Sequence, residues 1–293
     1  MILCIVCLLL SLFQEIVPFA IRQTIPQHSQ LNRNSVQKII VMMAEDDLNA
    51  DLSKMIWIKT EKEMEWNRSA ATAKVERKRF FRAGPQESGA VTSMVRFLPN
   101  ASFPLHPHPQ GEEIFVLNGK FIDERGTHGP GVFLFNPEGF QHSPSTDEDG
   151  NLILVRLRQY PNVKNLPPRC QKAIDTNTMP WIPKSNGVFE KVLYPTNGND
   201  DDDQNDYPEK QWLEKWEKNN SEMKSINVDH GGLEIFVVQG SFIDSLSDTT
   251  FNEHDWLRFP PNTHLNIKSP NGCILLYKSG GFQYAIPTSE KKV

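Results

Sequence analysis

The sequence predicts an all-β protein made of two tandem domains, and three observations lead to this prediction. Many prolines and phenylalanines accompany short runs of valine and isoleucine, a composition typical of strands. The segment at 111–123 recurs at 232–244 with nine of thirteen positions identical. The offset of 121 residues suits a whole small domain rather than a solenoid repeat. The strand spacing favours a sandwich or a double-sheet jelly roll in each copy.

Residues 1–50 are interpreted as a leader or a disordered segment. The stretch from Met1 to Phe13 is apolar, but no basic residue precedes it. One hypothesis is that the functional chain begins near Met43 and is cytoplasmic, and the alternative is a secretory signal within residues 1–20. No apolar run is long enough to cross a membrane as a helix, which argues against an integral membrane protein. The net charge of −5 argues against a nucleic-acid partner.

The first domain is predicted to span residues 51–165. Alternating and β-branched residues predict strands at 90–97, 131–135 and 152–157. The dipeptide Asn118-Gly119 lies between two short apolar runs, which is the strongest local signal for a two-residue hairpin. The first domain is therefore expected to consist of short antiparallel strands.

The second domain is predicted to span residues 166–288 and to repeat the hairpin around Gly240. It carries an insertion with four consecutive aspartates at 200–203. The segment 209–219 is predicted to form a short surface helix, because Trp212 and Trp216 are four residues apart and would share one face.

Three histidines and one glutamate of the first domain are spaced as a candidate metal site. His106 and His108 are two residues apart, so on a strand they point to the same side. Glu112 follows where the chain could return alongside them, and a turn through Pro137 to Gly139 could bring His142 back. Three imidazoles and one carboxylate are good ligands for zinc, iron, manganese, copper or nickel.

These residues resemble the cupin family. His106, His108, Glu112 and Gly119 fit the first cupin motif, H-x-H-x3-E-x6-G, and residues 131–142 fit the second, G-x5-P-x-G-x2-H. Two positions depart from the family pattern without being ligands, and they are Asn100 in place of glycine and Thr146 in place of asparagine.

The phrases ESGAVTSMVRF, HPHPQGEEIFVLNGKFIDERG and LILVRLRQY are similar to the ChrR-like cupin group, over roughly residues 55–285. The resemblance implies two tandem cupin jelly-roll (double-stranded β-helix) barrels, with one divalent metal ion, zinc or iron first and manganese next. It implies as ligands His106, His108, Glu112 and His142. The helical anti-sigma module of ChrR has no counterpart before residue 55, so regulation of transcription is not implied.

The second copy departs from the motif at the ligand positions. Asn227, Asp229 and Leu233 stand where the first copy has His106, His108 and Glu112. Shifting the alignment of the two copies by one residue would instead offer a partial site, but the side chains of that site would lie on the other face of the strand. The residues of that partial site are His230, Glu234 and His264. The second copy is therefore interpreted as a degenerate, structural domain.

Several other residues are given structural roles. Glu113 points away from Glu112 and recurs as Glu234, which favours a structural or supporting role over catalysis. His128 and His254 lie in polar segments and are expected to be solvated. Three phenylalanines are expected to belong to the core rather than to a substrate wall, namely Phe121, Phe133 and Phe135.

Two hypotheses of function follow. A mononuclear metal site with open positions could make the protein a dioxygenase-type enzyme on a small oxygen-chelating ligand, such as a β-diketone, an enediol or a 2-oxoacid. Alternatively, the chain is a non-catalytic metal-binding sensor or scaffold. The sequence leaves open which holds, and whether the protein is a monomer or a homodimer.

Overall fold

The computed structural model describes residues 47–68, 74–85, 88–195, 207–219 and 223–285. Of the segment 1–50 that was interpreted as a leader or disordered, residues 1–46 lie outside the described residues, as does the acidic loop at 200–203, whereas Leu48 forms a β-bridge with Arg82. Residues 47–286 group as one compact unit. Its helices are single turns: α4 (Thr60–Glu63), η1 (Thr176–Thr178) and η3 (Phe282–Ala285). The predicted all-β class is confirmed. In the described part of the chain, no helix is long and apolar enough to cross a membrane.

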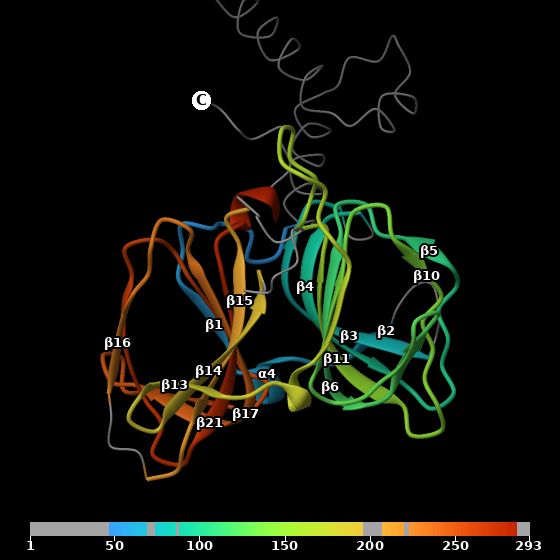
Figure 1. Cartoon of the computed structure of the whole chain (residues 1–293). Coiled ribbons are helices and arrows are strands. Elements are labelled where there is room, and N and C mark those ends of the chain that lie inside the picture. Colours follow the sequence, from blue (N-terminus) through green and yellow to red (C-terminus); the bar gives the residue numbers. More distant parts are fainter. Residues whose placement is uncertain (1–46, 69–73, 86–87, 196–206, 220–222, 286–293) are drawn as a thin grey trace, which may run out of the picture. The chain divides into compact units, whose positions relative to one another are not determined.

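The first half of the unit is built on one seven-stranded antiparallel sheet, drawn mainly in cyan and green in Figure 1. Its order is β12-β9-β6-β11-β4-β3-β2. Two small sheets, β10-β5 and β7-β8, complete the half. The strands are β2 (Asn67–Arg68), β3 (Val75–Ala83), β4 (Ala90–Phe97), β5 (His106–Pro107), β6 (Glu112–Gly119), β7 (Phe121–Asp123), β8 (Gly126–His128), β9 (Val132–Asn136), β10 (Gln141–His142), β11 (Asn151–Leu157) and β12 (Lys172–Asp175).

The second half repeats this plan in the sheet path β1-β19-β17-β21-β15-β14-β13. β18 and β20 also pair with β17, and β16 pairs with β20. In neither half do the described strands close into a continuous hydrogen-bonded barrel. The strands are β1 (Ile56–Ile58), β13 (Ile182–Ser185), β14 (Val188–Tyr194), β15 (Lys210–Trp216), β16 (Lys224–Asn227), β17 (Leu233–Asp244), β18 (Thr249–Asn252), β19 (Trp256–Phe259), β20 (His264–Lys268) and β21 (Cys273–Ser279).

The two halves exchange edge strands. β1 precedes the first half in sequence but pairs with β19 of the second, and in Figure 1 it lies among the orange strands. β12 follows the first half and pairs with β9 of the first sheet. Each exchanged strand covers a sheet edge that would otherwise expose unpaired backbone groups. The predicted division at residues 165 and 166 is thus crossed by pairing in both directions.

The predicted hairpin at Asn118-Gly119 is wrong. β6 pairs with β9 and β11, whereas β7 pairs with β8, so the two runs are not partners. In the second half the equivalent run is a single bent strand, β17, which passes from one set of partners to another. Gly119 has φ +68°, and a Cβ there would lie 2.1 Å from the carbonyl oxygen of Gly150. The glycine therefore permits a close crossing of two backbones rather than a reversal.

The predicted helix at 209–219 is also wrong, because Lys210–Trp216 is the strand β15, between β14 and β21. Residues four apart share a face on a strand as well as on a helix, so the spacing of Trp212 and Trp216 did not distinguish the two. Trp212 stacks on Tyr277 of β21 with ring centroids 4.9 Å apart. Side-chain packing of that kind across a sheet favours the strand over the helix in a segment whose spacing is compatible with both.

The contact between the halves is mainly apolar, with a buried charged cluster inside it. Phe80 stacks on Trp256 and Phe135 on Tyr194, with ring centroids 5.7 Å and 4.9 Å apart. The buried cluster joins Glu113 and Arg156 of the first half to Glu234 of the second, and all three side chains are 2% exposed or less. Alternation along β6 explains this arrangement, since Glu113 faces the other half while Glu112 faces inward.

Candidate metal centre

Two short strands and the start of a third bring the four predicted ligands together. β5 pairs antiparallel with β10 and places His106 directly opposite His142. His108 comes just after β5. A turn closed by a hydrogen bond from the Gly111 N–H to the His108 carbonyl (3.2 Å) then returns the chain, so that Glu112 begins β6. The local turn and the strand pairing thus assemble residues from both predicted motifs.

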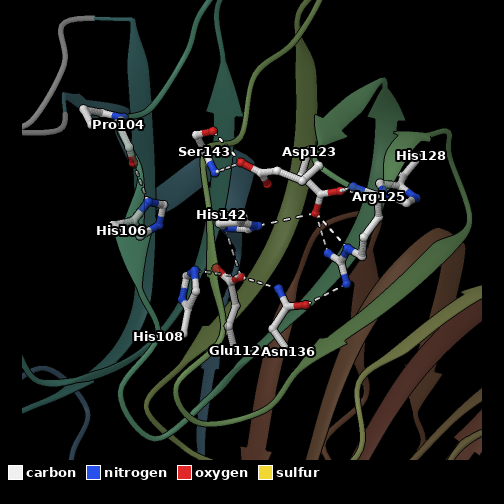
Figure 2. A network of polar contacts seen from close by, with 11 residues as sticks. Pro104, His106, His108, Glu112, Asp123, Arg125, His128, Asn136, His142 and Ser143 are labelled. Atoms are coloured by element: carbon white, nitrogen blue, oxygen red, sulfur yellow. Dashed lines mark hydrogen bonds and ion pairs between the residues drawn. The ribbon is translucent and has the colours of Figure 1, made fainter.

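The four side chains converge in Figure 2. The imidazole rings of His106, His108 and His142 have centroids 4.7 to 5.2 Å apart. One nitrogen from each ring lies within 4.8 Å of the others, close enough to hold a metal ion together. The Oε2 atom of Glu112 is 3.4 Å from His108 Nε2 and 3.5 Å from His142 Nε2. The three histidines could therefore hold a metal ion, and Glu112 as fourth ligand stays a prediction.

Electrostatics favour the neutral forms of His106 and His108. Burial lowers the pKa of His108 to about 3, and the neighbouring rings of His142 and His106 add to the effect. Burial also lowers the pKa of His106. The Nδ1 of His106 lies 2.7 Å from the carbonyl oxygen of Pro104, which can only accept, so Nδ1 carries the proton. The lone pair on Nε2 of His106 is then available to a ligand.

The carboxyl group and an unpaired nitrogen also fit a cation. Burial raises the pKa of Glu112, while the nearby His142 opposes that shift. The buried Nε2 of His108 has no hydrogen-bond partner among the described residues. An unsatisfied buried polar atom costs about 1–3 kcal/mol. A divalent ion would satisfy this nitrogen and stabilise the ionised carboxylate, so the residues present fit a metal.

Behind the ligands lies a network that sequence reasoning missed (Figure 2). The Oδ2 atom of Asp123 is 3.4 Å from His142 Nδ1. Arg125 donates to Asp123 at 3.0 Å and to the side-chain oxygen of Asn136 at 2.8 Å. Asn136 in turn donates to Glu112 Oε2 at 2.8 Å. Such outer hydrogen bonds fix the tautomer and orientation of metal ligands.

The sequence carried little signal for this network. Asp123 recurs as Asp244 in the second copy, where the ligands do not recur, so its recurrence does not single it out as part of a metal site. The prediction that His128 is solvated is wrong, because its Nε2 lies 3.1 Å from Asp123 Oδ1 and its side chain is 11% exposed. His254 is likewise half-buried, 3.5 Å from Glu61.

Replacing Asp123 with asparagine is expected to weaken metal binding by about 10–100-fold, because the negative charge facing His142 Nδ1 is lost. Competition against a chelating dye measures the affinity. Asp244→Asn is the matched control, since Asp244 occupies the same place in the repeat and accepts bonds from Leu246 and Ser247. Equal affinities for Asp123→Asn and the wild type, or equal losses in both variants, would contradict this role.

A cavity of about 360 Å³ opens onto the candidate ligands. All four of them line it, together with apolar side chains and three arginines. Phe121 belongs to the buried core of the first half, as expected, and it also contributes to the lining of the cavity. Phe133 and Phe135 are fully buried in the core between the halves, as predicted. The size of the cavity is at the small end of the range for ligand pockets.

The second half does not reproduce this cluster among its described residues. His264 Nδ1 lies 2.7 Å from the side-chain oxygen of Asn227. Glu234 faces the first half, where its carboxylate accepts from Arg156 Nε at 2.7 Å. Since Glu234 is directed away from His264, the partial site offered by a slipped frame is not assembled.

Comparisons with known proteins agree with this description. Residues 53–161 match the family model of the ChrR cupin-like domain, and all four predicted ligands lie in that segment. No curated protein sequence matches the chain.

Solved structures share the fold at low sequence identity. A protein from Nostoc punctiforme, provisionally named a dioxygenase, has TM-score 0.59 and 15% identity over 82% of this chain and 85% of its own. YlbA from Escherichia coli has TM-score 0.61 and 10% identity, and the match covers 83% of this chain and 97% of YlbA. The nickel(II) complex of the pirin YhhW from Escherichia coli has TM-score 0.54 and 14% identity, and the match covers 78% of this chain and 99% of YhhW. The predicted cupin jelly-roll class is thereby confirmed.

Proposed function

We propose that this protein, which carries a ChrR cupin-like domain at residues 53–161, is a bicupin with one working metal site, used in dioxygenase-type chemistry. The observation that carries the proposal is the convergence of His106, His108, His142 and Glu112 on the wall of a cavity. The cavity leaves room for a small ligand beside the ligand atoms. A four-donor set of this kind leaves one or two positions open on an octahedral ion.

Each residue would have a defined part in holding the ion. His106, His108 and His142 would supply neutral nitrogens, and Glu112 would supply a carboxylate oriented by Asn136. When bound, iron or manganese would supply Lewis acidity and redox chemistry with dioxygen. Apolar side chains around the cavity would limit the access of water to the ligand.

The proposed ligand is a small molecule that presents two oxygen atoms, such as a β-diketone, an enediol or a 2-oxoacid. The volume of about 360 Å³ supports a ligand of that size. The provisional dioxygenase name of the Nostoc punctiforme protein and the nickel held by YhhW support metal-dependent chemistry on this fold.

A second candidate is a non-catalytic metal sensor or scaffold with tightly bound zinc. The match to a domain named after ChrR favours it. A closed, four-coordinate zinc site without an exchangeable position is typical of structural zinc.

Metal content and oxygen uptake of the purified full chain test the proposal. Elemental mass spectrometry is expected to find about one iron or manganese ion per chain, and acetylacetone is expected to accelerate oxygen consumption. About one zinc ion without oxygen uptake would support the sensor or scaffold. Two ions per chain would contradict the assignment of the second half, and no metal would overturn the proposal.

A further inference from the structure

Arginines line the cavity on the strand β3, which carries no candidate metal ligand. Arg77 and Arg79 both contribute to the lining, as does Val75. These three residues alternate along β3, so they present their side chains to the same face of the sheet. Inward positions of a β-sandwich are ordinarily apolar, and two arginines in succession on this face give the cavity wall a charged segment.

The register of the sheet separates these arginines from the metal ligands. Arg79 pairs with Ser93 of β4, Ser93 with Val155 of β11, and Val155 with Ile114 of β6. β3 is thus three strands away from β6, where Glu112 lies. At about 4.8 Å per strand this is roughly 14 Å along the sheet. A small molecule in the cavity could contact the arginines of β3 at one end and the candidate metal site beside β6 at the other.

The charge of the cavity favours an anion. Three arginines line it, Arg77, Arg79 and Arg158. Among the described residues of the lining, Glu112 is the one acidic side chain. A divalent ion would add positive charge beside these guanidinium groups, which an anionic ligand would offset.

The rest of the lining sets the size and polarity of the ligand. Between the arginines and Glu112 the wall is formed by valine, isoleucine and leucine side chains of β4, β6 and β11, namely Val91, Val95, Ile114, Ile153, Val155 and Leu157. Such a wall buries a short hydrocarbon segment favourably. Arginine matches a carboxylate with paired N–H donors, and its five donors allow this alongside bonds to protein groups.

We propose that Arg77 and Arg79 bind the carboxylate of a small organic acid, whose other end carries the oxygen atoms that reach the candidate metal site. The inference rests on the proposed function, because it places the far end of the ligand at the metal. It deepens that function by naming the substrate class, an oxygen-chelating acid with a short apolar segment between its two ends.

Succinylacetone is a suitable probe, because it is acetylacetone with one terminal methyl group replaced by a propanoate arm. Its methyl ester keeps the diketone and the chain but removes the charge. Isothermal titration calorimetry on the metal-loaded full chain compares the two compounds in three forms of the protein. The forms are the wild type, the double variant Arg77→Gln/Arg79→Gln, and Arg82→Gln as a matched control on β3 outside the cavity lining.

We expect the acid to bind about tenfold or more tightly than the ester in the wild type and in Arg82→Gln, as partly desolvated carboxylate–arginine bonds predict. In the double variant the two affinities should agree within about twofold, with the ester bound as in the wild type. Retained ester binding shows that the double variant is folded. Equal affinities in the wild type, or an unchanged preference in the double variant, would overturn the inference.

Metal analysis of the same samples separates this inference from the proposed function. A chain that holds metal but does not distinguish acid from ester contradicts the inference alone. If the chain holds no metal, the proposed function fails, and butyrate against butyramide on that metal-free chain then tests the arginines. A preference for butyrate that the double variant loses supports the carboxylate subsite, whereas equal binding overturns it.

Discussion

Replacing His108 with alanine is expected to abolish stoichiometric metal binding. His108 is 3% exposed, lies 3.4 Å from Glu112 and has rings of two other histidines at 4.7 Å. Losing this central donor should lower the affinity by more than the roughly 10–100-fold that loss of an outer partner costs. Thermal unfolding offers a second measurement, since an ion at 100 times its dissociation constant stabilises the folded state by about 2.7 kcal/mol. The variant should lose that stabilisation.

The matched control is His264→Ala, which removes a histidine at the corresponding place of the second half. His264 contacts Asn227 there and lies outside the cluster of three histidines. Its metal content should equal that of the wild type. A His108→Ala protein that still retains one ion per chain would contradict the assignment of His108 as a ligand. Loss of metal in His264→Ala would mean that the metal site lies in the second half.

Replacing Arg156 with methionine is expected to destabilise the fold by about 3–5 kcal/mol, because two carboxylates would stay buried without a counter-charge. Arg156 contacts Glu113 within its own half, and its Nε donates to Glu234 of the other half at 2.7 Å. Although burial alone would lower it, these two carboxylates hold the pKa of Arg156 above its usual range. Urea unfolding followed by circular dichroism measures the free energy of unfolding.

The control for this variant is Arg68→Met. The Arg68 side chain is 72% exposed and lies 3.8 Å from Glu76, so its removal should change the free energy of unfolding by about 0–1 kcal/mol. Similar losses in both variants would mean that the Glu113–Arg156–Glu234 cluster does not stabilise the contact between the halves. The double replacement of both glutamates with glutamine would then be expected to cost little.

Local spacing was sufficient to predict much of the fold and the candidate site. The strand expected at 90–97 is β4, and those expected at 131–135 and 152–157 are β9 and β11 within one residue. Residues from both motifs meet where they were expected to meet, since β5 pairs with β10 and aligns His106 with His142. These predictions depend on residues whose relation is set by a strand or a turn of the backbone itself.

Predictions that needed distant partners were less successful. Asn118-Gly119 has the composition of a hairpin, but its glycine is required by a close approach to Gly150. Glu113 was correctly directed away from Glu112, yet no local pattern indicated that Arg156 of the same half would join it to Glu234 of the other half. The inward direction of Arg77 and Arg79 likewise became visible only when β3 was paired with β4.

The all-β class, the internal repeat and the order and spacing of the four candidate ligands can be read from the amino-acid sequence, because alternation and short-range spacing act along the chain. The exchange of β1 and β12, the burial of the Glu113–Arg156–Glu234 cluster and the composition of the cavity wall depend on the folded chain. Those features arise from pairing between segments far apart in sequence, which burial and backbone hydrogen bonding select only when the whole chain is folded.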